Sequence, residues 1–391
     1  MKKAVILAAG EGQRLRPFTV TKPKAMLSIA GKPILQYVIE SLEQNGIREI
    51  VVVVGYHREQ VFDYFGTGEQ FGVEISYVVQ ERQLGTAHAL AQAKNAVKGE
   101  FILLPGDNLI DGETIAKFIA SHPDAVLVKA VDNPSRYGMV IADGGLVKSI
   151  IEKPAEAESN IINTGIYVLS HRIFEYIDER LDIPDVLNGM LEAGHSLHVQ
   201  ETRGTWLDVV YPWDIVRLND AVLHRITARL GGTIEAGVMI KGQVFIGKDT
   251  VIRSNSYILG PATIGENCEI GPNVCIMPST SIGNNVVISP FVAIENSVIG
   301  SDVNIGPASI VQNSVIDHGC VIKGHFNACS GEAEVKIGDE WHTVDMGIML
   351  GADCRLGNSV VTQPGTIVGN YCEIQPMKLV SGTLPDRSHV Y

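Results

Sequence analysis

The chain has 391 residues, of which 45% are hydrophobic and 19% are charged, and its formal net charge is −13. This length and composition are typical of a folded protein of two domains and exclude a largely disordered chain. The negative charge argues against a nucleic acid or an anionic membrane as the main partner, because both would repel the protein. No apolar run reaches the roughly 18 residues of a membrane span, so no membrane is expected as a partner.

The cysteines and the first residues favour a cytoplasmic protein. All six cysteines lie in the second half of the chain, and none forms a CxxC pair. Scattered thiols in a long chain without a secretory leader are typical of a reducing compartment, where they serve as small core residues. The apolar run of residues 4–9 is too short for the core of a signal peptide.

The first predicted strand, KAVILAA, runs directly into the segment LAAGEGQRLRPFTVTKPKAML, which begins at Leu7. Gly10 and Gly12 allow the backbone to approach a ligand with several N–H groups directed at it, which suits a phosphate chain. The dinucleotide pattern GxGxxG is incomplete because Leu15 stands at its last position, and the Walker A pattern is absent. Basic side chains strengthen the phosphate interpretation: Arg14, Arg16, Lys22 and Lys24.

Up to about residue 230, strand-like apolar runs alternate with helical ones. In chain order they include PILQYVIESLEQNG, EIVVVVGY, REQVFDYF, EISYVVQ, TAHALAQAKNAV and FILLPGDN. Continuous runs of Val, Ile and Leu between helices predict a mostly parallel sheet that is covered on both faces. The expected fold is therefore a Rossmann-like α/β domain, in which ligands bind beyond the C-terminal ends of the strands.

A different sequence period begins at Ile234, from which isoleucine recurs every six residues as far as Ile294. Three such hexads make one triangular coil of a parallel β-helix, with the isoleucines stacked inside. The hexads break at residues 323–346, where a loop insertion is expected, and resume at Leu350. A connecting helix in PWDIVRLNDAVLHRITARLGG separates the two expected domains, residues 1–230 and residues 231–391.

The stretch LAAGEGQRLRPFTVTKPKAMLSIAGKPIL strongly resembles the opening motif of the sugar-1-phosphate nucleotidyltransferases, the family that makes nucleotide sugars. Other blocks of that family follow in order: QERQLGTAHAL, LLPGDN, RYGMV, EKP, NTGIYV and GTWLDVVYPWDI. The resemblance covers essentially all of residues 1–225. It implies Mg²⁺-dependent transfer of a nucleotidyl group from a nucleoside triphosphate to a hexose 1-phosphate, with release of pyrophosphate.

The resemblance also implies roles for individual residues. Asp107 and Asp208 would be the carboxylate ligands of Mg²⁺. Arg14 would hold the β- and γ-phosphates, Lys24 would bridge the attacking and leaving groups, and Lys153 would hold the incoming sugar phosphate. The nucleotide would be bound by Leu7, Ala8, Ala9, Gly10, Gly12, Gln80, Gly85 and Thr86, with Gln80 reading the base. The hexose phosphate would be bound by Gly138, Glu152, Lys153, Asn163 and Thr164, with Trp206 nearby.

The chemistry agrees with these residue types. A sugar phosphate oxygen attacks the α-phosphorus in line, and two polyanions must be brought together while charge moves to the leaving group. A hard cation on two carboxylates offsets the repulsion between the phosphates. The attacking oxygen is already ionised near neutral pH, so neither a general base nor a covalent intermediate is needed.

The α/β domain followed by a hexapeptide β-helix resembles the bifunctional enzymes that form UDP-N-acetylglucosamine. This implies a left-handed coil and a second activity that uses acetyl-CoA. In that family a Gly-His pair supplies a general base, and KGHF here offers His325. Ala328 replaces the tyrosine of the family pattern and no GAGT-type segment follows, so His325 is also compatible with an ordinary loop residue. The tail looks more like an archaeal-type pyrophosphorylase, whose β-helix implies a homo-oligomer, either a trimer or a dimer of trimers.

Three classes of function stay open. As a transferase, the chain is expected to prefer UTP over dTTP, because LGTAHA resembles the uridylyl-transferring members more than the thymidylyl-transferring members. Glucose 1-phosphate and N-acetylglucosamine 1-phosphate are both compatible acceptors. A non-catalytic regulatory subunit would keep the fold without the chemistry, which the retention of Arg14, Lys24, Asp107 and Asp208 argues against. A hexapeptide acyltransferase would use the β-helix alone.

Overall fold

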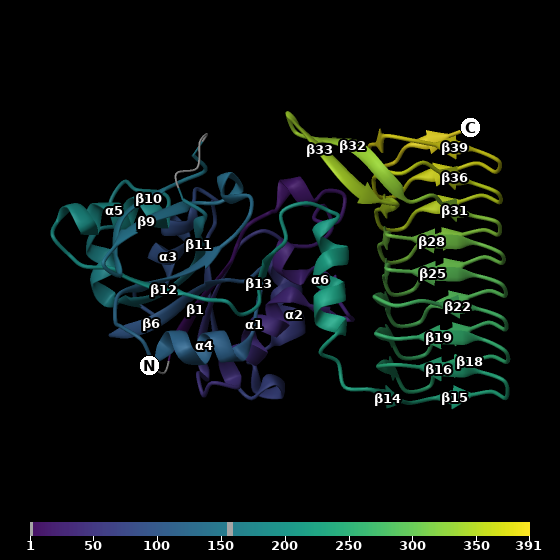
Figure 1. The fold of residues 1–391 in the computed structure, drawn as a ribbon, viewed down its shortest axis with the longest axis horizontal. Coiled ribbons are helices and arrows are strands. Elements are labelled where there is room, and N and C mark those ends of the chain that lie inside the picture. The colour runs from purple at the N-terminus through teal and green to yellow at the C-terminus, as the bar shows by residue number, and fades with distance from the viewer. Residues whose placement is uncertain (1–2, 155–158) are drawn as a thin grey trace. The chain divides into compact units, whose positions relative to one another are not determined.

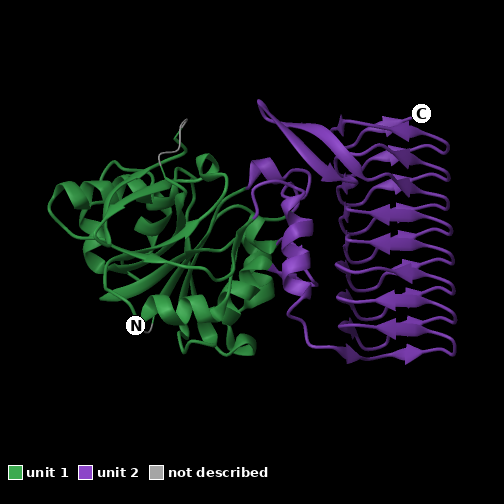
Figure 2. Cartoon of the chain, viewed as in Figure 1, with its two compact units in different colours: residues 1–11, 22–26, 34–208 green, residues 12–21, 27–33, 209–391 purple. Residues whose placement is uncertain are grey.

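The computed structural model describes residues 3–154 and 159–391. The chain forms two compact units, coloured separately in Figure 2. Unit 1 comprises residues 1–11, 22–26 and 34–208, and unit 2 comprises residues 12–21, 27–33 and 209–391. Two short pieces of the N-terminal motif therefore belong to the same unit as the C-terminal half of the chain. Among the described residues no helix is both long and apolar enough to cross a membrane.

Unit 1 is built on a nine-stranded mixed sheet with the order β5-β4-β1-β6-β11-β8-β12-β10-β9 (Figure 1). The neighbours β5, β4, β1 and β6 are parallel, as the alternating pattern predicts, whereas β11 runs antiparallel to β6 and to β8. The strands are β1 (Lys3–Ala8), β4 (Glu49–Val54), β5 (Glu74–Val79), β6 (Glu100–Pro105), β8 (Ala125–Ala130), β9 (Met139–Asp143), β10 (Leu146–Ile151), β11 (Ile161–Ser170) and β12 (His198–Glu201).

Helices cover both faces of this sheet. They are α1 (Ile34–Glu43), α2 (Arg58–Phe65), α3 (Thr86–Gln92), α4 (Gly112–Ile119) and α5 (Ile183–Glu192). Successive residues of β1 enter opposite hydrophobic clusters: Ile6 packs with residues of α1, α2 and α4, and Val5 with residues of α3 and α5. Because both faces are buried, the strands are apolar throughout rather than alternating.

A two-stranded ribbon in unit 1 brings together two distant parts of the sequence. Strand β13 (Trp206–Asp208) pairs antiparallel with β7 (Asn108–Ile110), which follows β6 directly. The register places Asp208 opposite Asn108. The end of β13 thus lies beside the carboxyl end of a central parallel strand.

Unit 2 contains a parallel β-helix of three long sheets, which confirms the interpretation of the hexads (Figure 1). The left-handed sense of the coil stays a prediction. The first sheet contains β14 (Arg229–Leu230), β17 (Val244–Ile246), β20 (Ala262–Ile264), β23 (Thr280–Ile282), β26 (Val298–Ile299), β29 (Val315–Ile316), β34 (Ile348–Leu350), β37 (Thr366–Val368) and β40 (Thr383–Leu384). The second contains β15 (Thr233–Ile234), β18 (Val251–Ile252), β21 (Glu269–Ile270), β24 (Val287–Ile288), β27 (Asn304–Ile305), β30 (Val321–Ile322), β35 (Arg355–Leu356), β38 (Glu373–Ile374) and β41 (His389–Val390). The third contains β16 (Met239–Lys241), β19 (Tyr257–Leu259), β22 (Cys275–Ile276), β25 (Ala293–Glu295), β28 (Ile310–Gln312), β31 (Asn327–Ala328), β36 (Val361–Thr362) and β39 (Leu379–Val380).

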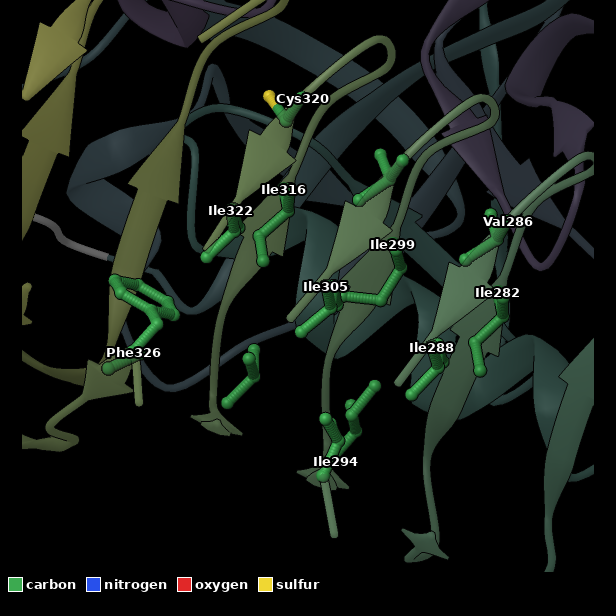
Figure 3. Close-up of a cluster of buried hydrophobic side chains, with 14 of the residues drawn as sticks. Ile282, Val286, Ile288, Ile294, Ile299, Ile305, Ile316, Cys320, Ile322 and Phe326 are labelled. Carbon is green, nitrogen blue, oxygen red and sulfur yellow. The ribbon is translucent and has the colours of Figure 1, made fainter. Parts of the chain in front are cut away.

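The hexad isoleucines form the core of this β-helix (Figure 3). Each stacks on its counterpart in the next coil, as Ile264 does on Ile282 and Ile282 on Ile299. The step is 18 residues in the first of these pairs and 17 in the second, which explains why the strict six-residue spacing slips after Ile294. Many corner positions have positive φ and are occupied by asparagine or aspartate, which tolerate this conformation better than most side chains. Four of the free cysteines are buried: Cys268, Cys320, Cys354 and Cys372.

A hairpin interrupts the coils, where the broken hexads predict an insertion. It consists of β32 (Gly331–Ile337) and β33 (Glu340–Met346), paired antiparallel along their whole length. The strands β30 and β31 before it still belong to the coil. Its residues contact the segment before α6 (Asp214–Leu223): the Tyr211 hydroxyl donates to Glu340 Oε2 at 3.0 Å, and the rings of Tyr211 and His342 lie 4.3 Å apart.

Helix α6 connects the β-helix to the short ribbon of β2 (Ser28–Ile29) and β3 (Lys32–Pro33). Asn219 on this helix is fully buried. Its Oδ1 accepts from the Ala30 amide at 3.1 Å, and its Nδ2 donates to the Ser279 carbonyl at 2.9 Å. One amide therefore joins the ribbon, the helix and a coil of the β-helix.

Replacing Asn219 by alanine is expected to lower the free energy of unfolding by about 1–3 kcal/mol, because the partly buried Ala30 amide and Ser279 carbonyl lose their partner. Guanidinium denaturation followed by circular dichroism would measure the change. An unchanged midpoint would mean that these two hydrogen bonds give no net stabilisation.

Candidate active site

The two aspartates that the sequence analysis singled out lie together in unit 1. Asp107 follows the end of β6, and Asp208 is the last residue of β13. The ammonium group of Lys24 forms ion pairs with both: it contacts Asp107 Oδ2 and lies 3.5 Å from Asp208 Oδ1. The three side chains are only 18–23% exposed, so solvent screens their charges incompletely.

Asn108, which the sequence analysis did not select, holds the two carboxylates together. With the amide assigned the orientation that its neighbours favour, its nitrogen donates to Asp107 Oδ1 and to Asp208 Oδ1, each at 3.1 Å, and its oxygen accepts from Trp206 Nε1 at 3.0 Å. Trp206 is buried and packs edge-on against Tyr137, with ring centroids 5.5 Å apart. In the sequence, Asn108 is marked only by its position directly after Asp107 in PGDN. Its hydrogen-bond partners come together only when β13 pairs with β7.

The protonated state of Lys24 is stabilised by these neighbours. Burial alone would lower the pKa of Lys24, but the negative charges of Asp107 and Asp208 and hydrogen bonds to both outweigh it and raise that pKa above the ordinary value. Lys24 is therefore cationic at physiological pH. The cluster combines two carboxylates with one positive charge at the end of a strand.

The two carboxylates of this cluster are suited to supply part of the ligands of a Mg²⁺ ion. Among residues 3–154 and 159–391, no group of three or more His, Cys, Asp or Glu side chains could hold a metal ion. Mg²⁺ in phosphoryl-transfer sites is commonly bound by one or two carboxylates, and substrate phosphates and water complete the octahedron. Asp107 and Asp208 supply such a pair, so a cation here would depend on the substrate for its remaining ligands.

The predicted phosphate-binding backbone begins at the end of β1, where Leu7 is half-buried and Ala8 and Ala9 are buried. Gly10 is exposed, and a Cβ at this position would meet nothing within 4 Å. Gly55 packs closely against this backbone: a Cβ there would come within 2.9 Å of the Ala9 carbonyl oxygen and 2.7 Å of Gln83 Nε2. Only glycine at position 55 therefore leaves room for this turn of backbone.

Gly12 and Arg14 belong to unit 2. Gly12 has φ 75° and ψ 48°, in the left-handed region that favours glycine, and it precedes a 3-10 turn formed by Gln13–Leu15. Arg14 is exposed on this turn, whereas Leu15 is buried. The turn thus presents the guanidinium group to solvent while the neighbouring leucine fixes the backbone.

The predicted base-reading residues Gln80 and Gly85 lie side by side in unit 1. The buried Gln80 donates from Nε2 to the Gly85 carbonyl at 3.1 Å and makes a second hydrogen bond, of 2.9 Å, with His88 Nδ1. Gly85 has φ 146°, and the Leu181 carbonyl leaves no room for a Cβ. The glycine is therefore required both for its backbone conformation and for close contact with residue 181.

Thr86 has a local structural role. Its backbone N–H and its hydroxyl donate to Asp182 Oδ1 at 3.0 and 3.2 Å, and the hydroxyl accepts from the Ile183 amide at 2.9 Å. These bonds join the first turn of α3 to the first turn of α5. Asp182 is not recognisable from the sequence, because nothing local relates it to the LGTAHA segment.

The structure also brings together most of the predicted sugar-side residues. A Cβ on Gly138 would approach Glu152 Oε2 at 2.8 Å, and the Asn163 amide donates to the Gly138 carbonyl at 2.7 Å. The Asn163 side chain donates from Nδ2 to the Tyr167 hydroxyl at 2.6 Å. One site is therefore bordered by Gly138, Glu152 and Asn163. The buried Tyr167 supports it through its contact with Asn163.

Lys153 and Thr164 differ in their access to this site. The Lys153 side chain is 47% exposed and its Nζ lies 3.9 Å from Glu152 Oε1, so it is free to turn toward an anionic ligand. Thr164 is buried, and its hydroxyl donates to the Leu127 carbonyl at 2.6 Å. Thr164 thus joins β11 to β8.

His325 lies on an exposed corner of the β-helix between β30 and β31, with φ 60°. Its backbone amide donates to the Pro307 carbonyl at 2.8 Å. The exposed ring is compatible with either alternative that the sequence left open.

Comparison with known proteins adds independent findings. A family model described as "Nucleotidyl transferase" matches residues 3–225, and one described as "GMPPB C-terminal domain" matches residues 258–384. The chain is 34% identical to the "Bifunctional sugar-1-phosphate nucleotidylyltransferase/acetyltransferase" of Sulfurisphaera tokodaii, over 97% of each chain. It is 38% identical to a "Bifunctional protein GlmU" of Methanococcus maripaludis over 65% of this chain and 62% of that protein, which is less than two thirds of its length.

A solved structure resembles part of this chain. A crystal structure from Bacillus anthracis, described as a "Putative Glucose-1-Phosphate Thymidylyltransferase" in complex with a sucrose, superimposes with a TM-score of 0.53 at 30% sequence identity. It covers 58% of this chain and 97% of its own.

Proposed function

Because this chain belongs to the nucleotidyl transferase family, we propose that it transfers a nucleotidyl group from UTP or dTTP to a hexose 1-phosphate and releases pyrophosphate. The observation that carries the proposal is the cluster in which Asp107 and Asp208 share Lys24 and the Asn108 amide. A non-catalytic subunit would have no need to keep two carboxylates and a lysine in mutual contact.

The residues of this cluster, together with Arg14, would stabilise the negative charges of the phosphates in different ways. Asp107 and Asp208 would hold Mg²⁺, which supplies a Lewis acid to the phosphate oxygens. Lys24 would donate to phosphate oxygens between the attacking and leaving groups, since its charge is maintained by both aspartates. Arg14 would hold the β- and γ-phosphates, where its planar group can form two parallel hydrogen bonds.

The sugar phosphate would bind beside Gly138. The absence of a side chain at residue 138 lets Glu152 Oε2 approach the backbone closely, and Glu152 and Asn163 both offer hydrogen bonds to hydroxyl groups. Lys153 would meet the phosphate, because its half-exposed ammonium group lies beside Glu152. Gln80 and Gly85 would contact the base through side-chain and backbone groups.

The experiment is a matrix of pyrophosphate release with Mg²⁺, in which UTP, dTTP, ATP and GTP are each combined with glucose, N-acetylglucosamine and glucosamine 1-phosphates. Release that needs both substrates and is strongest with UTP supports the proposal. Release without a sugar phosphate would indicate hydrolysis instead, and no release with any pair would contradict the proposal.

Replacing Asn108 by alanine is expected to weaken the apparent Mg²⁺ affinity by about 10–100-fold, because the carboxylates lose the amide that orients them. A Mg²⁺ titration of the initial rate would measure this. Asn188→Ala is a matched control, since the Asn188 amide likewise makes two hydrogen bonds, in its case with the backbone N–H and C=O of Ile150. The control should leave the Mg²⁺ dependence unchanged.

Acetyl transfer to glucosamine 1-phosphate is a second candidate function, favoured by the exposed His325 and by the name of the Sulfurisphaera relative. Acetyl-CoA would be the donor. Release of the CoA thiol in the presence of glucosamine 1-phosphate, lost in His325→Ala, would support it. Thiol release at the uncatalysed rate would leave the β-helix without this activity.

A further inference from the structure

The segment of residues 12–21 forms a compact loop within unit 2. The Thr19 hydroxyl donates to the Gly12 carbonyl at 2.8 Å, and the Leu15 amide donates to the same carbonyl at 2.9 Å. Leu15 and Phe18 are each 1% exposed, whereas Arg14 is exposed. The loop therefore has a buried side and an exposed side that carries two arginines, Arg14 and Arg16.

A buried asparagine of the β-helix holds this loop. Asn370 lies at a corner between β37 and β38, is fully buried, and donates from Nδ2 to the Pro17 carbonyl at 3.0 Å. The same nitrogen donates to Asp386 Oδ1 at 3.0 Å, and Oδ1 accepts from the Ala352 amide at 2.8 Å. Both hydrogens of its amide are used, one for the coil and one for the loop.

The coil itself does not explain why this asparagine contacts the loop. Asn284 occupies the matching corner of an earlier coil, where its Oδ1 accepts from the Glu266 amide at 2.8 Å, as Asn370 does from Ala352. Asn284 is nevertheless exposed. The two residues thus share the bond within the β-helix and differ in burial and in the bond to Pro17, which joins residues 353 positions apart.

We propose that Asn370 is a positioning residue for the nucleotidyl transfer, because it fixes the loop that carries Arg14. The β-helix then contributes to catalysis in addition to any role in assembly. This inference rests on the proposed function, in which Arg14 holds the β- and γ-phosphates of the triphosphate. A shift of the Pro17 backbone would move the arginine three residues away by a similar amount, and phosphate contacts depend steeply on distance.

The test uses the full-length protein with Asn370→Ala and Asn370→Asp. Aspartate keeps the size of the side chain and the acceptor for Ala352, but when ionised it can donate neither to the Pro17 carbonyl nor to Asp386. Both variants should raise KM for the triphosphate, and KM for pyrophosphate in the reverse reaction, by about three- to tenfold, the effect of one buried hydrogen bond. KM for the sugar 1-phosphate should stay unchanged, because Arg14 would not contact it.

Asn284→Ala and Asn284→Asp are the matched controls, since alanine removes only the bond within the β-helix and aspartate keeps the acceptor of that bond. A general loss of stability would lower kcat through the active fraction and leave all three KM values unchanged. Equal effects of the Asn370 and Asn284 variants, or an equal rise of KM for all substrates, would overturn the inference.

Amide hydrogen exchange of residues 12–21 separates this inference from the proposed function. Faster exchange in this loop in Asn370→Ala than in Asn284→Ala is expected whether or not the parent protein releases pyrophosphate. Unchanged exchange overturns the inference even in an active enzyme. A parent protein without pyrophosphate release would contradict the proposed function alone.

Discussion

Replacing Asp107 by asparagine is expected to reduce pyrophosphate release at least about a thousandfold, since the site loses a metal ligand and half of its negative charge. The variant should stay folded, because the asparagine oxygen can still accept from the Asn108 amide that bonds Asp107 Oδ1 at 3.1 Å. The rate at saturating substrates, measured over a range of Mg²⁺ concentrations, checks the prediction. Higher Mg²⁺ should restore little of the activity.

Asp143→Asn is the control for this experiment. Asp143 has a side chain that is 81% exposed and lies 3.8 Å from the exposed Lys148, so its replacement removes a charge of the same kind outside the cluster. Its activity should match that of the parent. A rate for Asp107→Asn within a factor of about ten of the parent would remove Asp107 from the reaction, because loss of a direct contact with developing charge costs more than this.

Replacing Lys24 by methionine is expected to reduce the rate by about 100- to 1000-fold, the effect of removing one preorganised donor. It also leaves Asp107 and Asp208 facing each other without the intervening cation. The variant should therefore lose stability in the absence of Mg²⁺, and part of the loss should return when Mg²⁺ is added. Thermal unfolding with EDTA and with Mg²⁺ would measure both effects.

The pH dependence of this stability follows from the pKa of Lys24. That pKa is raised in the folded protein above its ordinary value of 10.5. The stabilisation is thus fully present below about pH 10.5 and is lost as the pH rises through the folded value. The stability difference between the parent and Lys24→Met should be constant from pH 7 to 10 and decrease at higher pH, with Lys148→Met showing no such trend.

The antiparallel half of the central sheet could not be predicted from the local pattern. Strand β11 looks like any other apolar run, and its direction is decided by pairing with β6 and β8, which are far away in the sequence. The division of the N-terminal motif between two compact units is a similar case. Contacts made by residues 12–21 and 27–33 with the C-terminal half depend on where the chain returns after many turns of β-helix.

The sequence by itself determined the α/β rhythm, the β-helix and the identity of the acidic and basic residues of the candidate site. Each of these depends on a short period or a short motif, because hydrophobic burial acts on every strand or coil in the same way. Only the tertiary structure decided which polar groups support them: Asn108, Asp182, Asn219 and Asn370. An isolated asparagine has no periodic signal, and its role is set by the distant donors and acceptors that would otherwise be buried without partners.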